Sequence, residues 1–152
     1  MPNPTYIAAL KMLARRELSE RQVRQRLARQ GHPDDAVDDA VARLKVDRSL
    51  DDDRVAHALA RHEVLTRRHG RARAERQLAA AGISAPLARA ALDEVLGGVD
   101  QDTLLESALR RRLRDSEAVA DQKAFQRLYR YLLGQGFESD RILRVLKQRR
   151  ST

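Results

Sequence analysis

Apolar residues follow a helical period along the whole chain, and short polar segments interrupt that period at regular intervals. In three places a leucine lies four residues before a glycine: Leu27 before Gly31, Leu78 before Gly82, and Leu132 before Gly136. Around each glycine the apolar positions recur at spacings of three and four, so they share one face of a helix. Each glycine is therefore predicted to end a helix with a positive φ, after which a new helix begins.

A further apolar stripe precedes each of these helix pairs, over residues 7–18, 55–60 and 104–113. No stretch alternates β-branched and polar residues, so the pattern predicts no strand. The chain is expected to be all-α, with one three-helix unit used three times, and we place the units at residues 1–48, 49–99 and 100–152. A tandem array of this kind exposes long faces, which favours a binding surface over an enclosed pocket.

Helix starts are marked by capping residues and prolines. Three tetrads have the form of a capping box, in which side chains satisfy the free N–H groups of a first turn. They begin at Ser19, Ser49 and Thr103. Prolines also fall near three predicted helix starts, where a missing N–H has no cost; these are Pro4, Pro33 and Pro86.

Charge gives the first indication of what the surface binds. Lysine and arginine total 30 against 22 acidic residues, a net charge of +8, and 26 of the 30 are arginine because only four are lysine. The planar guanidinium group matches phosphate and carboxylate alike. Polyanions or acidic protein surfaces are therefore the expected partners, and charge alone does not choose between them.

The sequence offers no catalytic constellation. It has no cysteine and its four histidines lack ligand spacing, while glycine-loop and serine-nucleophile motifs are absent. Asp51 and Asp52 begin an acidic run that is expected to complement a helix dipole rather than to bind a cation. We therefore expect no enzyme, no cofactor and no metal. Without a bilayer-spanning apolar run or a signal peptide, the protein is expected in the cytoplasm and away from membranes.

Arginines concentrate in two segments, residues 67–76 and 110–114, and further cations occur at helical spacing in the first and third units. Gly70 lies inside the first segment, and the helix predicted to start after it adds backbone donors that favour anions. A solvated charged face is the alternative explanation for any single cation. The candidate contact residues are Arg21, Arg24, Arg67, Arg68, Arg71, Arg73, Arg76, Arg110, Arg111, Arg112, Arg114, Arg144 and Lys147.

In their order and spacing, these motifs resemble the RecX family of regulatory proteins. The matching stretches are residues 8–19 with the turn at Gly31, residues 50–56 with Asp51 and Asp52, residues 70–83 with Gly70 and Gly82, and residues 131–137 with Gly136. Val55 stands where the family pattern has an aromatic residue, and we expect this change to reduce core volume rather than to alter function.

The resemblance implies a specific role. The family binds the RecA recombinase on single-stranded DNA and inhibits filament extension, ATP hydrolysis, strand exchange and induction of the DNA-damage (SOS) response. Its members resemble elongated, curved arrays of three three-helix repeats that lie in the filament groove. The implied partners are the RecA filament and, weakly and without sequence preference, single-stranded DNA. A monomer is expected because no long coiled-coil seam is present.

Two other interpretations stay open. Three-helix units with a basic second or third helix are also typical of helix-turn-helix DNA-binding transcriptional regulators, with Gln25 and Gln77 as possible base-reading residues. The array is also compatible with a general helical scaffold for an unrelated acidic partner.

Overall fold

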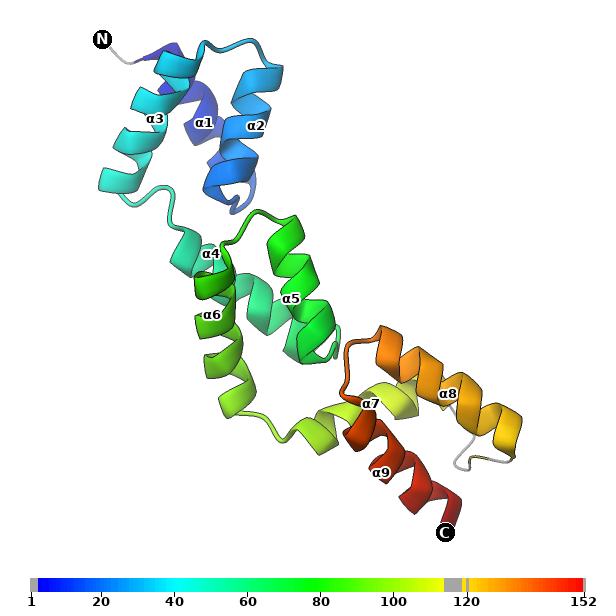
Figure 1. Cartoon of the computed structure of the whole chain (residues 1–152). Coiled ribbons are helices and arrows are strands. Elements are labelled where there is room, and N and C mark those ends of the chain that lie inside the picture. Colours follow the sequence, from blue (N-terminus) through cyan, green and yellow to red (C-terminus); the bar gives the residue numbers. More distant parts are fainter. Residues whose placement is uncertain (1–2, 114–118, 120, 152) are drawn as a thin grey trace.

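The computed structural model describes residues 3–113, 119 and 121–151, and all regular structure among these residues is helical. Figure 1 shows three helical units that follow one another along an elongated molecule, with the two chain termini at opposite ends. The prediction of an all-α tandem array of three-helix units is confirmed.

Each unit contributes three helices. The first unit contains α1 (Pro4–Arg15), α2 (Glu20–Arg29) and α3 (Asp34–Val46). The second contains α4 (Asp52–Arg61), the π-helical turn η1 (His62–Thr66), α5 (Arg71–Ala80) and α6 (Ala85–Gly97). The third contains α7 (Gln101–Leu113), α8 (Gln122–Gly134) and α9 (Ser139–Ser151). The apolar stripes predicted the α-helices, whereas η1 has no counterpart in that prediction.

The three leucine–glycine turns have one common geometry. The glycines have positive φ values of 87° at Gly31, 92° at Gly82 and 100° at Gly136. In each turn the carbonyl of the leucine accepts the N–H of the residue after the glycine, at 3.0–3.2 Å. This hydrogen bond, from the N–H of residue i+5 to the carbonyl of residue i, closes the C-terminal end of α2, α5 and α8. It accounts for the constant spacing of leucine and glycine. The predicted helix ends are confirmed.

The predicted helix starts are confirmed at Ser19 and corrected at two other positions. Ser19 Oγ accepts the N–H of Gln22 at 3.2 Å, and Gln22 returns a bond to the N–H of Ser19 at 3.0 Å. The boxes predicted at Ser49 and Thr103 are wrong, because Asp51 caps α4 and Asp100 accepts the N–H of Thr103 near the start of α7. An aspartate next to the first turn is at least as good a cap as serine or threonine and also complements the helix dipole.

The three prolines occupy the predicted places at helix starts. They are the first residue of α1, the residue before α3 and the second residue of α6, namely Pro4, Pro33 and Pro86. Each lies where the helix has no intrahelical partner for an N–H, so proline costs no hydrogen bond there.

The described residues form two hydrophobic cores, because the second and third units share one. The first core is confined to the first unit and includes Leu18, Leu27 and Leu44, which are fully buried. The second core runs from Val55 in α4 to Leu146 in α9 without a break between the units. Val55, which stands where the family pattern has an aromatic residue, is buried in this core.

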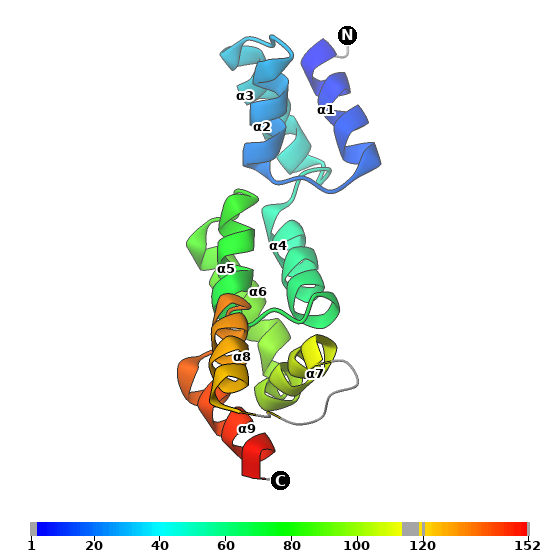
Figure 2. The same cartoon turned by 90° about the vertical axis from the view of Figure 1, so that its right-hand side faces the viewer.

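The second helices of the three units, α2, α5 and α8, stack end to end (Figure 2). The start of α2 meets the end of α5, where Ser19 Oγ donates to the carbonyl of Ala81 at 2.5 Å. The start of α5 meets the end of α8, where the N–H of Gly70 donates to the carbonyl of Gln135 at 2.8 Å. The positive end of each helix dipole therefore faces the negative end of the next, which is a favourable arrangement. We call this stack the helix column.

Candidate protein and nucleic-acid interface

The two predicted arginine segments meet at the junction of the second and third units. Arg111 on α7 donates through Nη2 to the carbonyl of Thr66, the last residue of η1, at 3.3 Å. Arg67 and Arg68 follow Thr66 directly, and Arg110 precedes Arg111 on the helix. These four residues, Arg67, Arg68, Arg110 and Arg111, are called the junction arginines below. The contact places charge from two distant parts of the sequence on one surface.

A buried polar pair holds the linker that carries Arg67 and Arg68. Glu63 and His69 are nearly inaccessible, and His69 Nδ1 lies 2.5 Å from the Glu63 carboxylate. Burial lowers the pKa of His69 against the opposing effect of Glu63, so the neutral ring donates its Nδ1–H to the carboxylate. The N–H of His69 also donates to the Glu63 carbonyl at 2.9 Å. The linker is thus anchored on both sides of Arg67 and Arg68, and Arg68 takes a φ of 56°.

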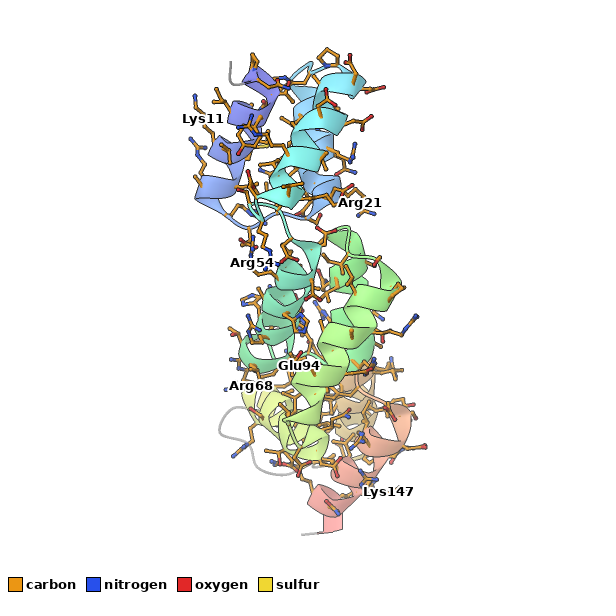
Figure 3. The ribbon with its side chains drawn as sticks, turned by 90° about the vertical axis from the view of Figure 1, so that its left-hand side faces the viewer. Lys11, Arg21, Arg54, Arg68, Glu94 and Lys147 are labelled. Atoms are coloured by element: carbon orange, nitrogen blue, oxygen red, sulfur yellow. The ribbon has the colours of Figure 1, made fainter. Side chains whose placement is uncertain are left out.

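Three junction arginines are exposed, and one of them, Arg111, is bound to the Thr66 carbonyl. The side chains of Arg67 and Arg110 are exposed and have no ion pair or hydrogen bond within the part of the chain that the structure describes. Arg68 is half-buried, and Figure 3 shows it at the outer edge of the molecule, where the second unit approaches the third. Because these guanidinium groups keep their full donor capacity, the surface can bind carboxylate or phosphate groups.

Other predicted contact residues hold the units together. Arg21 donates through Nη2 to the carbonyls of Ala79 and Ala80 at the end of α5, at 3.1 and 2.9 Å. Arg73 makes the equivalent contact with the end of α8, through the carbonyl of Gly134 at 3.5 Å and the side chain of Gln135 at 3.3 Å. In both cases a cation satisfies the negative end of the neighbouring helix. These two arginines are therefore parts of the helix column.

A second group of predicted contact residues is engaged in ion pairs. Arg24 pairs with Glu20 and Asp38, and Arg71 pairs with Glu75 and Asp93. Arg144 donates to both oxygens of Asp102 at 2.8 Å, which joins α9 to α7. Burial on its own raises the pKa of Asp102, but the hydrogen bonds from Arg144 and Arg141 outweigh it and hold that pKa below its usual range.

The remaining predicted contact residues differ in their surroundings. Arg112 lies over the ring of Tyr131 with its guanidinium carbon 5.0 Å from the ring centre, so part of its donor plane is covered. Arg76 and Lys147 are exposed on α5 and α9. Arg114 lies outside the described residues.

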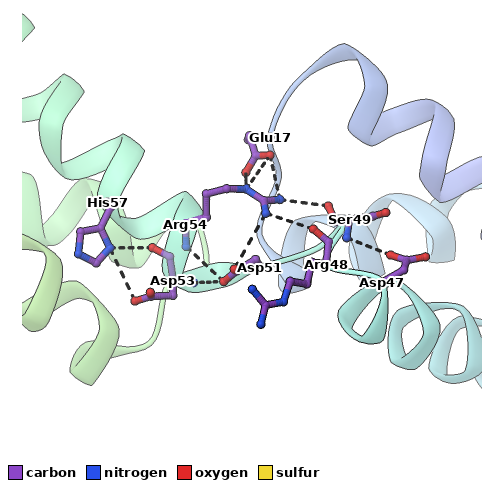
Figure 4. Close-up of polar contacts among 8 residues, drawn as sticks. All are labelled: Glu17, Asp47, Arg48, Ser49, Asp51, Asp53, Arg54 and His57. Atoms are coloured by element: carbon purple, nitrogen blue, oxygen red, sulfur yellow. Dashed lines mark hydrogen bonds and ion pairs between the residues drawn. The ribbon is translucent and has the colours of Figure 1, made fainter.

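Residues 51–54 join the first unit to the second, and Figure 4 shows one of these connections, from Arg54 to Glu17. Asp51 caps its own helix by accepting the N–H groups of Asp53 and Arg54 at 3.0 and 3.3 Å. Asp52 accepts the N–H of Glu20 at 2.8 Å and therefore caps α2 in the preceding unit. Arg54 Nε donates to both oxygens of Glu17 at 3.1 Å, and its Nη groups reach the carbonyls that precede α4. Asp51, Asp52 and Arg54 therefore have structural contacts within the described residues.

Comparison with known proteins agrees with this arrangement. Three family models match in order: the first three-helix domain of RecX over residues 6–44, the second over residues 51–92 and the third over residues 100–146. The regulatory protein RecX of Halorhodospira halophila is 33% identical over 136 residues, which cover 89% of this chain and 81% of that protein. The chain belongs to the RecX family. The regulatory protein RecX of Syntrophotalea carbinolica is 28% identical over 146 residues and 95% of each chain.

Solved RecX structures have the same fold. The crystal structure of RecX from Lactobacillus salivarius superimposes with a TM-score of 0.79 over 95% of this chain and 93% of that one, at 19% sequence identity. A second crystal structure of a regulatory protein RecX gives a TM-score of 0.78 over 95% of this chain. Because the curated relatives are regulatory proteins, this chain has a regulatory role within the RecX family.

One group of cations in this RecX family chain was not predicted as a contact surface. A groove between α1 and α2 is lined by Lys11, Arg15, Arg16, Arg26 and Arg29. The sequence contains a signal for it, since Lys11 and Arg15 are four apart and Arg26 and Arg29 are three apart, the spacings of one helix face. The signal is ambiguous because only the packing of α1 against α2 brings the two rows together.

The described residues contain no group of three or more histidine, aspartate or glutamate side chains placed to hold a metal ion. In the same part of the chain, no helix has the length and apolar character that crossing a bilayer requires.

Proposed function

We propose that this chain is a non-catalytic negative regulator of the RecA recombinase. It binds the RecA filament on single-stranded DNA and inhibits filament extension, ATP hydrolysis, strand exchange and induction of the SOS response. Family membership supports this role, because the relatives are regulatory proteins and the fold is shared with solved RecX structures. The chain acts as a monomer in the cytoplasm and contacts DNA weakly and without sequence preference.

The observation that carries the proposal is the meeting of the two arginine segments at the Arg111–Thr66 contact. Several other predicted cations are bound within the chain, whereas Arg67 and Arg110 remain exposed on this surface. An elongated molecule with such a surface at the junction of its second and third units can span more than one subunit of a filament. Binding across subunits would oppose the addition of further RecA monomers and the ATP-dependent cycle.

The test is RecA ATP hydrolysis on single-stranded DNA with substoichiometric amounts of this protein. We expect hydrolysis to fall and filaments seen by electron microscopy to shorten. Unchanged hydrolysis and filament length would overturn the proposal. A pull-down from extract that recovers an unrelated acidic protein in place of RecA would favour the general scaffold.

A pair of variants locates the surface. Arg67→Gln with Arg110→Gln removes two exposed junction charges without breaking a side-chain contact among the described residues, and it is expected to weaken inhibition by about tenfold. Arg89→Gln with Arg127→Gln removes the same charge from exposed positions elsewhere and is the matched control. Equal inhibition by both variants would exclude the junction arginines as the contact.

The helix-turn-helix alternative predicts a different result with DNA alone. A transcriptional regulator would bind one duplex sequence with much higher affinity than other sequences at the same salt concentration. Gln25 and Gln77, the possible base-reading residues, are exposed on α2 and α5. Binding that is indifferent to sequence and falls steeply with salt supports the RecA regulator instead.

A further inference from the structure

The groove between α1 and α2 in the first unit is strongly basic. It has a volume of about 720 Å³, and five cations line its walls: Lys11 and Arg15 on α1, Arg16 just after α1, and Arg26 and Arg29 on α2. No carboxylate lines it, and Ala8 and Met12 form an apolar part of its surface. Figure 3 shows Lys11 projecting from the flank of α1 into solvent. The five cations are all exposed.

The groove cations have no internal partner in the part of the chain that the structure describes. Among the described residues, none of the five side chains makes an ion pair, a hydrogen bond or a ring contact. Two acids near Arg15, Arg16 and Arg26 in the sequence are already engaged, since Glu17 pairs with Arg54 and Glu20 pairs with Arg24 and Lys45. Five like charges in one hollow repel one another, and a bound polyanion would relieve that repulsion.

We propose that this groove binds the phosphodiester backbone of single-stranded nucleic acid. Arginine forks match phosphate oxygens in geometry and stay charged at every relevant pH. No aromatic side chain lines the groove, so it has no stacking platform for reading or ranking bases. Binding is therefore sequence-independent, salt-sensitive and located in the first unit, away from the junction arginines.

The apolar surface favours a single strand over a duplex or an acidic peptide. Unpaired bases expose flat apolar faces that can cover Ala8 and Met12 while the phosphates reach the surrounding cations. A duplex keeps its bases inside and leaves that surface bare. An acidic peptide offers carboxylates without the apolar faces. The inference names a site for the DNA binding stated in the proposed function. It rests on that DNA binding and not on the inhibition of RecA.

The experiment measures binding of a fluorescent oligo-dT by anisotropy across a series of salt concentrations, with the full chain and without RecA. The groove variant combines Arg15→Gln, Arg26→Gln and Arg29→Gln, and the control variant combines Arg89→Gln, Arg127→Gln and Arg130→Gln. All six arginines are exposed, and within residues 3–113 and 121–151 none has an internal partner, so circular dichroism should show both variants folded. Both variants lose three positive charges, so a difference in their affinity for oligo-dT reports where the charges lie and not how many were removed.

We expect the groove variant to lose about tenfold or more in affinity, and its log–log salt slope to fall by about 2, which corresponds to three lost phosphate contacts on a single strand. The control variant should lose less than about twofold. A duplex of the same length and poly-glutamate should bind the wild-type chain more weakly than oligo-dT. Equal losses in both variants, no loss in the groove variant, or equal binding of poly-glutamate would each overturn the inference.

The same variants separate this inference from the proposed function. Inhibition of RecA together with absent oligo-dT binding would overturn the groove and leave the regulator intact. Groove-dependent oligo-dT binding without any effect on RecA ATP hydrolysis would overturn the proposed regulator and leave the groove inference intact.

Discussion

Gly70 lies in backbone contact with Gly136 across the junction of the second and third units. A Cβ atom placed on Gly70 would overlap the carbonyl group of Gly136, and one placed on Gly136 would overlap the backbone of Arg73. The absence of both side chains lets the N–H of Gly70 donate to the Gln135 carbonyl at 2.8 Å and the N–H of Ala72 donate to the Gly136 carbonyl at 3.2 Å. The two glycines therefore set the distance between these units.

Alanine at Gly70 is expected to lower the free energy of unfolding by about 3 kcal/mol, because the backbones must separate to accept the methyl group. Gly134 is the control, since a Cβ there meets no atom within 4 Å and α8 accepts alanine readily. Urea unfolding followed by circular dichroism compares the variants. A Gly70→Ala protein as stable as Gly134→Ala would show that the junction tolerates expansion.

Asp51 and Asp52 are expected to stabilise different units. Asp51→Ala removes the cap of α4, and Asp52→Ala leaves the N–H of Glu20 at the start of α2 without its acceptor. Each change should cost about 1 kcal/mol. Amide hydrogen exchange should accelerate in α4 for the first variant and in α2 for the second. Asp39→Ala, an exposed change on α3, should leave both rates unaltered; acceleration confined to α4 in both variants would contradict this division.

The first unit is expected to open before the other two. It has a separate core and is joined to α4 and α5 by polar contacts, such as those from Arg54 to Glu17 and from Ser19 to Ala81. The second and third units share one core and should open together. Hydrogen exchange in rising urea should give one lower opening free energy for α1–α3 and one higher value for the rest. A single value for the whole chain would disprove the separation.

His57 is expected to stabilise the protein only while it is protonated. Its Nδ1 lies 2.9 Å from the Asp53 carbonyl and its Nε2 lies 2.6 Å from the Glu94 carboxylate, so only the imidazolium ion can donate to both. The Asp53 carbonyl and Glu94 outweigh burial and raise the pKa of His57. Its contribution is therefore full below the unfolded pKa of about 6.5 and is lost as the pH rises through the folded value.

The measurement is an NMR titration of His57 together with unfolding at several pH values. We expect a folded pKa above about 6.5 and a contribution of less than about 1 kcal/mol, because the Glu94 side chain is 72% exposed. His57→Gln should remove the corresponding pH dependence. A titration midpoint below 6.5 would show that the folded protein does not stabilise the imidazolium ion at these contacts.

The leucine–glycine turns show which parts of this fold are local enough to predict. The spacing of Leu78 and Gly82 is set by one bond between residues five apart, so the pattern is visible in the sequence. The turn η1 escaped prediction because no helix breaker lies within residues 62–66, and its anchor, the Glu63–His69 pair, is recognisable only once both side chains are buried.

The arginines show the opposite limit. Arg21 and Arg73 have acceptors that are 58 and 61 residues away along the chain, so the sequence shows two exposed charges where the structure has two junction contacts. Arg15 and Arg26 lie on separate helices, and only the packing of α1 against α2 turns them into one groove. The sequence shows which residues are charged. It does not show which of these charged side chains are bound within the chain and which can contact a partner.

The helix column gives the array a direction. Both junctions join the start of one second helix to the glycine turn of the next unit, so the two ends of the molecule are unlike. At one end the turn at Gly31 has no neighbouring atom within 4 Å of a Cβ position. Any partner that contacts all three units therefore meets them in a fixed order. On a partner with its own polarity, such as a filament, the chain can bind in one orientation along the partner but not in the opposite one.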